Sequence, residues 1–246
     1  MADHPPIETY SELDSTNAEA RRRAEAGDSG PVWITVARQT AGRGRRGRAW
    51  STQPGNLAAT LLMVTELAPA EAAQVSFVAA LAVQDLAEVC LGRGIARLKW
   101  PNDLLIHGGK AAGILTESGP RADDRLWLAV GVGVNLAHAP ADLDPPATAF
   151  ADHMAGPPPA PLEALDVLAA RFEVWRDRWA REGFAPIGQA WSERAHGLGR
   201  RCEARLANRT LAGVAEALEP DGALRLRLDD GAVERITAGD VFFGVC

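Results

Sequence analysis

Apolar and polar positions along the chain change period several times, and these changes outline its elements. Apolar runs and alternating segments predict strands at residues 7–13, 31–38, 57–63, 96–100, 104–106, 110–116 and 126–135. A period near 3.6 predicts helices over residues 18–26, 69–92, 162–182 and 187–195. In the second helix the apolar stripe consists of Val75, Val78, Leu81, Ala82, Leu86 and Val89. After Gly197 only short alternating strands remain, with turns at 219–222 and 229–231.

This order of elements predicts two parts in one α/β (α+β) protein. Residues 1–197 are expected to form a mixed β-sheet flanked by helices, and residues 198–246 a small β-barrel-like domain. With 246 residues, 47% of them hydrophobic, the chain is large enough to bury a core. No stretch approaches 18 uninterrupted apolar residues and no basic-then-apolar leader opens the chain, so a soluble, cytoplasmic protein without membrane contact is expected.

The densest charge in the chain is the arginine loop, Gly42–Arg48, which reads Gly-Arg-Gly-Arg-Arg-Gly-Arg within a chain of net charge -6. Guanidinium groups pair bidentately with phosphate, and glycines let the backbone approach a ligand closely. The glycines also match the dinucleotide-binding pattern, but Trp50 and Pro54 follow where that fold needs a helix, so we reject this reading. The alternative to anion binding is an ordinary solvent-exposed loop whose arginines only aid solubility. The loop's like charges predict that it is mobile until an anion binds.

Lysine is rare, because 24 of the 26 basic residues are arginine and only Lys99 and Lys110 remain. Lys99 lies between two apolar residues just before Pro101, which favours a pocket over the surface. The three cysteines and five histidines are scattered without the spacing of a metal site.

Two further stretches are candidates for ligand contact. Ser15 and Thr16 precede a helix, where they would cap it or bind a polar group. Gly131 and Gly133 share one face of a strand with Asn135, which predicts a flat ligand against the sheet; a bulge or a close sheet crossing is the alternative.

Five motifs in this order resemble the biotin protein ligase family over most of the chain. They are Asp14-Ser15-Thr16-Asn17, the stretch Gln39 to Arg48 with Trp50, Lys99-Trp100-Pro101-Asn102-Asp103, Lys110 to Glu117, and Gly131-Val132-Gly133-Val134-Asn135. The resemblance implies a catalytic domain at 1–197 and an SH3-like β-barrel at 198–246. It implies that the biotin carboxylate attacks the α-phosphate of ATP, and that a lysine of a biotin carboxyl carrier protein then takes the acyl group from biotinyl-AMP.

The resemblance also implies which residues act. Lys99 and Arg45 would be catalytic. Biotin would be bound by Ser15, Thr16, Asn17, Gln39, Gly42, Arg43, Gly44, Arg45, Lys99, Gly113 and Gly131. ATP or the adenylate would be bound by Arg43, Arg45, Arg46, Arg48, Trp50, Asn102, Gly133 and Asn135. Mg²⁺ is expected with ATP, without ligands that we can assign.

The family's two-domain core fits the chain without a preceding DNA-binding domain, so we expect no DNA partner and no repressor activity, while a homodimer is compatible with the resemblance. Two other functions stay open. Lipoate protein ligase shares the acyl-adenylate chemistry, but the arginine loop and the C-terminal domain favour biotin. An RNA-binding module could use the loop as a clamp, yet the acidic balance and the single short basic run disfavour it.

Overall fold

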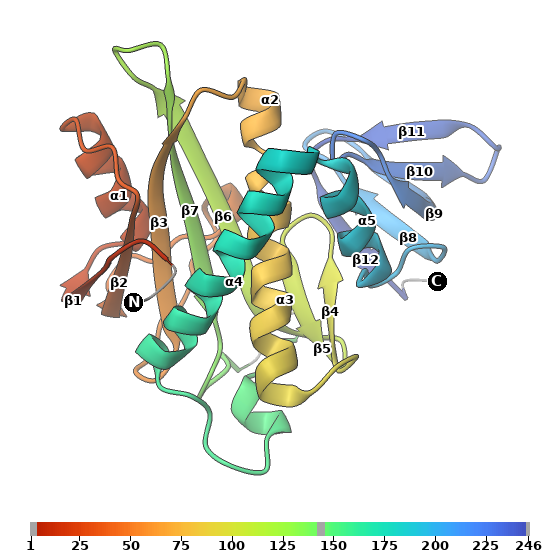
Figure 1. Cartoon of the computed structure of the whole chain (residues 1–246). Coiled ribbons are helices and arrows are strands. Elements are labelled where there is room, and N and C mark those ends of the chain that lie inside the picture. Colours follow the sequence, from red (N-terminus) through yellow and green to blue (C-terminus); the bar gives the residue numbers. More distant parts are fainter. Residues whose placement is uncertain (1–3, 142–145, 245–246) are drawn as a thin grey trace.

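The computed structural model describes residues 4–141 and 146–244. A seven-stranded sheet in the order β1-β2-β3-β7-β6-β5-β4 forms the larger part (Figure 1). Its strands are β1 (Ile7–Leu13), β2 (Val32–Gln39), β3 (Leu57–Thr65), β4 (Ala96–Lys99), β5 (Asp103–Ile106), β6 (Gly109–Pro120) and β7 (Leu126–Val134). Only β1 and β2 run parallel. A parallel pair needs a crossover, which α1 (Thr16–Glu25) supplies.

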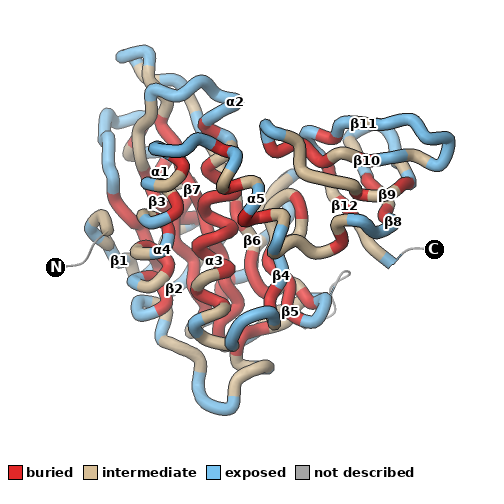
Figure 2. The backbone as a smooth tube through the Cα atoms, turned by 45° about the vertical axis from the view of Figure 1, so that its right-hand side comes forward, coloured by how far each residue is buried: buried red, intermediate tan, exposed pale blue. Residues whose placement is uncertain are grey.

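Helices cover the two faces of this sheet unequally. On one face lie α3 (Val75–Leu91) and α4 (Pro161–Glu182), preceded by the short α2 (Pro69–Ala72) and followed by α5 (Ala185–Glu193). Figure 2 shows the buried residues concentrated in α3 and the strands that it covers. The opposite face carries α1, packed on a smaller apolar cluster that includes Ile34 and Ala129. This half-covered face leaves room for a ligand.

The strand β7 shows how the sequence pattern sets these faces. Val130, Val132 and Val134 belong to the main core under α3 and α4. The alternate residues Gly131 and Gly133 therefore point to the α1 face, as expected from the period of two. The predicted helix and strand order is confirmed, with two local corrections. The helix predicted over residues 69–92 is divided between α2 and α3, and Val89 is 58% exposed although its stripe predicted burial.

The C-terminal part is a five-stranded antiparallel sheet in the order β11-β10-β9-β8-β12, in agreement with the SH3-like class that we expected. Its strands are β8 (Arg201–Arg205), β9 (Thr210–Leu218), β10 (Leu224–Leu228), β11 (Val233–Ile236) and β12 (Asp240–Phe243). Aromatic side chains join it to the larger part. The Trp100 indole donates a hydrogen bond to the Gly222 carbonyl (3.0 Å), and the Phe77 ring lies so close to Gly222 that a Cβ atom there would be 2.6 Å from it.

The stretch Pro69–Leu91 has a mean hydropathy of 1.4 over its best window, and its 23 residues are long enough to cross a membrane. In this fold 61% of that window is buried. Residues of α3 such as Leu81 and Val83 are fully enclosed by the sheet and α4. Its hydropathy is accounted for by its place as the core helix.

Candidate active site

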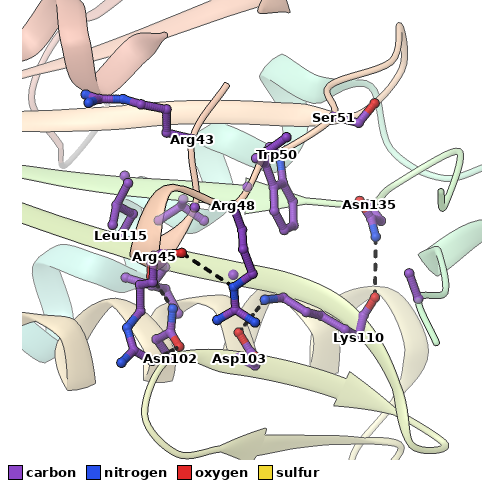
Figure 3. A pocket seen from close by; sticks show the side chains of 18 of the residues that line it. Arg43, Arg45, Arg48, Trp50, Ser51, Asn102, Asp103, Lys110, Leu115 and Asn135 are labelled. Carbon is purple, nitrogen blue, oxygen red and sulfur yellow. Dashed lines mark hydrogen bonds and ion pairs between the residues drawn. The ribbon is translucent and has the colours of Figure 1, made fainter. Parts of the chain in front are cut away.

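A cavity of about 440 Å³ opens on the α1 face of the sheet. Its walls come from the start of α1, the arginine loop, β6, β7 and the strand β12 of the C-terminal domain (Figure 3). The expected site residues that line it are Ser15, Thr16, Asn17, Gln39, Arg43, Gly44, Arg45, Arg48, Trp50, Lys99, Asn102, Gly113, Gly131, Gly133 and Asn135. Gly42 and Arg46 belong to the same loop without lining the cavity. The fold thus brings together motifs that are far apart in the sequence.

One end of the cavity is lined by uncharged polar side chains, which are bonded to one carboxylate outside the lining, that of Glu117. The Gln39 side-chain oxygen accepts from the Thr16 backbone N–H (2.9 Å), and the Thr60 hydroxyl donates to Asn17 Oδ1 (2.7 Å). Asn17 Nδ2 in turn donates to Glu117 Oε2 at 2.8 Å. Thr16, Asn17 and Thr60 are almost fully buried, so these bonds fix each donor and acceptor in place. Such an array suits a small ligand group that has both donors and acceptors.

Ser15 occupies the position preceding α1, but its side chain makes no capping hydrogen bond. Ser15 is only 4% exposed, and it lines the cavity. Simple helix capping therefore does not explain Ser15. Asn135 is anchored differently, because its amide donates to the Thr148 carbonyl at 3.2 Å and so ties the end of β7 to the segment before α4.

The space above the β7 glycines is filled by the protein itself. A Cβ atom on Gly131 would collide with Asn17 Oδ1, and one on Gly133 would collide with the indole of Trp50. Gly113 on β6 also faces this indole, at 3.3 Å from a Cβ position. Gly131 and Gly133 line the cavity, and the expectation of a flat ligand on this glycine face stays a prediction. The glycines let two side chains lie close to the sheet, where they form the cavity wall.

We expect Gly133→Val to displace Trp50 and to weaken biotin binding by at least tenfold, since the new side chain occupies the place of the indole. Calorimetric titration with biotin measures the affinity, and a thermal melt reports any loss of stability. Gly156→Ala, before α4, is a control for glycine loss, because a Cβ there would meet nothing within 4 Å and the backbone does not have a positive φ. An unchanged affinity in a folded Gly133→Val variant would contradict this placement of Trp50.

Both lysines of the chain line the cavity. The Lys99 ammonium lies 5.3 Å from the centre of the Phe242 ring, and burial lowers the pKa of this lysine. Lys110 forms an ion pair with Asp103 at 2.6 Å and lies 5.7 Å from the centre of a Trp50 ring. Lys110 and Asp103 were absent from the site residues assigned by sequence. The rarity of lysine was the signal that could have added Lys110.

We expect Lys99→Arg to keep the fold but to slow adenylate formation at least tenfold, because a planar guanidinium cannot replace a compact ammonium in a tight pocket. The pH profile is a second measure. Since burial lowers the pKa of Lys99, activity that needs its ammonium falls at a lower pH than for an exposed lysine. The arginine variant keeps its charge and loses this alkaline decline. Normal rates in the folded variant would exclude the role of Lys99.

The arginines of the loop point in two directions (Figure 3). Arg45 donates to Asn102 Oδ1 at 3.0 Å, and burial lowers its pKa. Arg48 points the same way, whereas Arg43 points to the polar end, 3.5 Å from Glu117 Oε1. The loop therefore does not present one undivided cationic surface: Arg43 and the pair Arg45 and Arg48 face opposite ends of the cavity.

The expectation that the loop is mobile until an anion binds stays a prediction, but the loop already has an anionic partner within the chain. The carboxylate of Asp240, at the start of β12, lies within ion-pair distance of Arg45, Arg46 and Arg48. Within residues 4–141 and 146–244 no three His, Cys, Asp or Glu side chains cluster as a metal site would require. The two carboxylates of the cavity wall, Asp103 and Asp240, are each held by cationic groups.

Two segments of the chain match known protein families. Residues 12–135 match the biotin/lipoate A/B protein ligase family, and residues 197–244 match the biotin protein ligase C-terminal domain. The chain belongs to the biotin/lipoate A/B protein ligase family, and the resemblance inferred from its motifs is confirmed.

Particular relatives are close in length as well as sequence. The chain is 45% identical to a biotin--[acetyl-CoA-carboxylase] ligase of Paracoccus denitrificans, over 94% of this chain and 98% of that protein. Its fold is similar to the biotin protein ligase of Aquifex aeolicus solved with biotin and ATP, with a TM-score of 0.80, 25% identity, and coverage of 96% and 97%. The Leishmania major biotin protein ligase, solved with biotinyl-5-AMP, matches at a TM-score of 0.66 with 26% identity, over 95% and 99%.

Proposed function

We propose that this protein uses ATP to attach biotin to a lysine of a biotin carboxyl carrier protein or domain, through biotinyl-AMP. The observation that carries the proposal is one cavity with two chemically different ends. The neutral network around Asn17 and Gln39 matches the ureido ring of biotin, which has two N–H donors and one carbonyl acceptor. Lys99, Lys110 and Arg45 line the other part, where a carboxylate and phosphates would meet.

In the first step the biotin carboxylate attacks the α-phosphorus of ATP, the bond to the β-phosphate oxygen breaks, and pyrophosphate leaves. Negative charge then concentrates on the phosphate oxygens, where the ammonium and guanidinium groups of the wall stabilise it. Lys110 is assigned this role together with Lys99 and Arg45, because its ammonium is fixed by Asp103 beside Trp50. Positioning the two reactants supplies the rest of the rate enhancement.

In the second step the amine of the carrier lysine attacks the acyl carbon of biotinyl-AMP, an amide forms, and AMP leaves. The chain itself needs no nucleophile. Mg²⁺ is proposed to enter on the phosphates of ATP, where it would neutralise part of their charge. Because Asp103 and Asp240 are both paired, a metal held by protein carboxylates alone does not fit this cavity.

The remaining expectations are part of the same proposal. We infer a catalytic domain at residues 1–197, a C-terminal domain at 198–246, a cytoplasmic location, and neither DNA nor membrane among the partners. The matches at residues 12–135 and 197–244 support the two domains, and the negative charge of the whole chain disfavours DNA and an anionic membrane as partners.

Pyrophosphate release from ATP tests the function directly. The purified protein is incubated with ATP and either biotin, lipoate or neither, and then with a biotin carboxyl carrier domain. We expect release that depends on biotin, followed by biotin on the carrier lysine. Release that depends on lipoate alone would favour the lipoate ligase alternative. If neither biotin nor lipoate stimulates pyrophosphate release, the protein is not an acyl-adenylate-forming enzyme.

A further inference from the structure

Asp240 places one carboxylate of the C-terminal domain among the guanidinium groups of the arginine loop. Its oxygens lie 3.6 Å from Arg45, 3.2 Å from Arg46 and 3.0 Å from Arg48. The Asp240 side chain is 18% exposed, so it is less hydrated than an ordinary surface carboxylate. A single negative charge thus offsets the mutual repulsion of three positive ones.

The loop is also docked on this domain through backbone groups. Arg45 donates to the Gly239 carbonyl at 3.0 Å, and Arg46 donates to the Arg205 carbonyl at 3.4 Å. Arg46 has a φ of 55°, in the left-handed region that a residue with a Cβ rarely adopts. Contacts with β8 and β12 therefore hold the loop in a conformation that its own sequence does not favour.

This contact leaves the loop able to bind phosphate. A guanidinium has five N–H donors, and Arg48, which lines the cavity, uses one for Asp240 and one for the Arg45 carbonyl. The remaining donors are available to an incoming anion, so Asp240 and a phosphate can be bound at the same time. The effect of Asp240 is to order the loop in advance and not to block it.

We propose that Asp240 is a positioning residue that holds the arginine loop in its binding conformation before any phosphate arrives. In this way the C-terminal domain takes part in substrate binding. That the bound anion is a phosphate of ATP rests on the proposed function. That Asp240 orders the ligand-free loop does not rest on it. Ordering in advance removes a cost that substrate binding would otherwise carry.

Limited trypsin digestion of the full-length, ligand-free protein tests the ordering. Cleavage after Arg43 to Arg48 is followed by mass spectrometry in the wild type and in Asp240→Asn, which removes the charge at nearly constant size. We expect cleavage in the loop to be at least tenfold faster in Asp240→Asn. Asp240→Glu restores the charge and should restore protection.

Asp229→Asn is the matched control, because Asp229 pairs with Arg201 in the same domain but lies outside the cavity. It should be cleaved like the wild type. Equal loop cleavage in Asp240→Asn and Asp229→Asn would overturn the proposal. Cleavage spread over the whole Asp240→Asn chain would also overturn it, since that would mark a general role in folding.

Steady-state kinetics give a second test, because a residue that only stabilised the fold would not change KM for ATP selectively. We expect KM for ATP to rise at least threefold in Asp240→Asn, with kcat within twofold of the wild type. A fall in kcat at constant KM would overturn the positioning role. If the wild type forms no biotinyl-AMP, the proposed function fails, while the digestion of the ligand-free loop still decides the role of Asp240.

Discussion

Replacing Lys110 by methionine will reduce biotinyl-AMP formation at least 100-fold while the protein stays folded. A methionine keeps most of the side-chain length, so the cavity wall retains its shape, but the ammonium is lost. Asp103, whose side chain is 17% exposed, then carries a negative charge close to where phosphates bind. A 100-fold loss corresponds to about 2.7 kcal/mol of transition-state stabilisation. Single-turnover formation of the adenylate from biotin and ATP measures it.

Two comparisons sharpen this result. In the double variant Lys110→Met with Asp103→Asn the unpaired carboxylate is also gone, so part of the lost activity should return. Lys110→Arg keeps the charge but not the compact shape, and it should be slower than the wild type and faster than Lys110→Met. Adenylate formation by Lys110→Met at more than a tenth of the wild-type rate would rule out a direct role.

Replacing Trp191 by alanine will lower the free energy of unfolding by about 3 to 5 kcal/mol, the usual effect of truncating a buried aromatic side chain. Trp191, in α5, is 1% exposed and packs against Phe77 of α3. For a chain of this length, the loss lowers Tm by roughly 6 to 20 °C. Differential scanning calorimetry measures both quantities.

Trp50→Ala is the matched comparison for Trp191→Ala. The same side chain is removed there, but from the partly exposed wall of the cavity. We expect Trp50→Ala to change Tm by less than half as much as Trp191→Ala, and to weaken substrate binding instead. If the two variants have equal Tm values, the assignment of one tryptophan to the core and the other to the cavity is refuted.

The parts of this fold that could be predicted from sequence are those set by local periodicity. Strand β1 has the predicted bounds, and the alternation in β7 places Val132 in the core and Gly133 on the opposite face, as its period of two requires. Periodicity also overestimated burial at Val89, because the pattern of a helix does not reveal where its neighbours end. Where the burial of a residue depends on packing between elements, the pattern of one element does not predict it.

The candidate site was predictable as a set of motifs but not as a set of contacts. Short motifs identified residues such as Gln39 and Lys99, which do line the cavity. No local signal links the arginine loop to Asp240, because the two lie at opposite ends of the sequence and meet only in the folded chain. The indole over Gly133 is hidden for the same reason. Glycine indicates that something lies close, without indicating what it is.

The placement of both lysines in the cavity has a consequence for side reactions. Biotinyl-AMP acylates amines, and an enzyme that forms it exposes its own surface to a reactive product. Here the other 24 of the 26 lysine and arginine side chains are guanidinium groups, which stay protonated and are poor nucleophiles. Apart from the terminal amino group, the only amines of the chain that the product can modify are Lys99 and Lys110. Self-modification would therefore be confined to the N-terminus and to the site itself, where it would appear as inactivation during turnover.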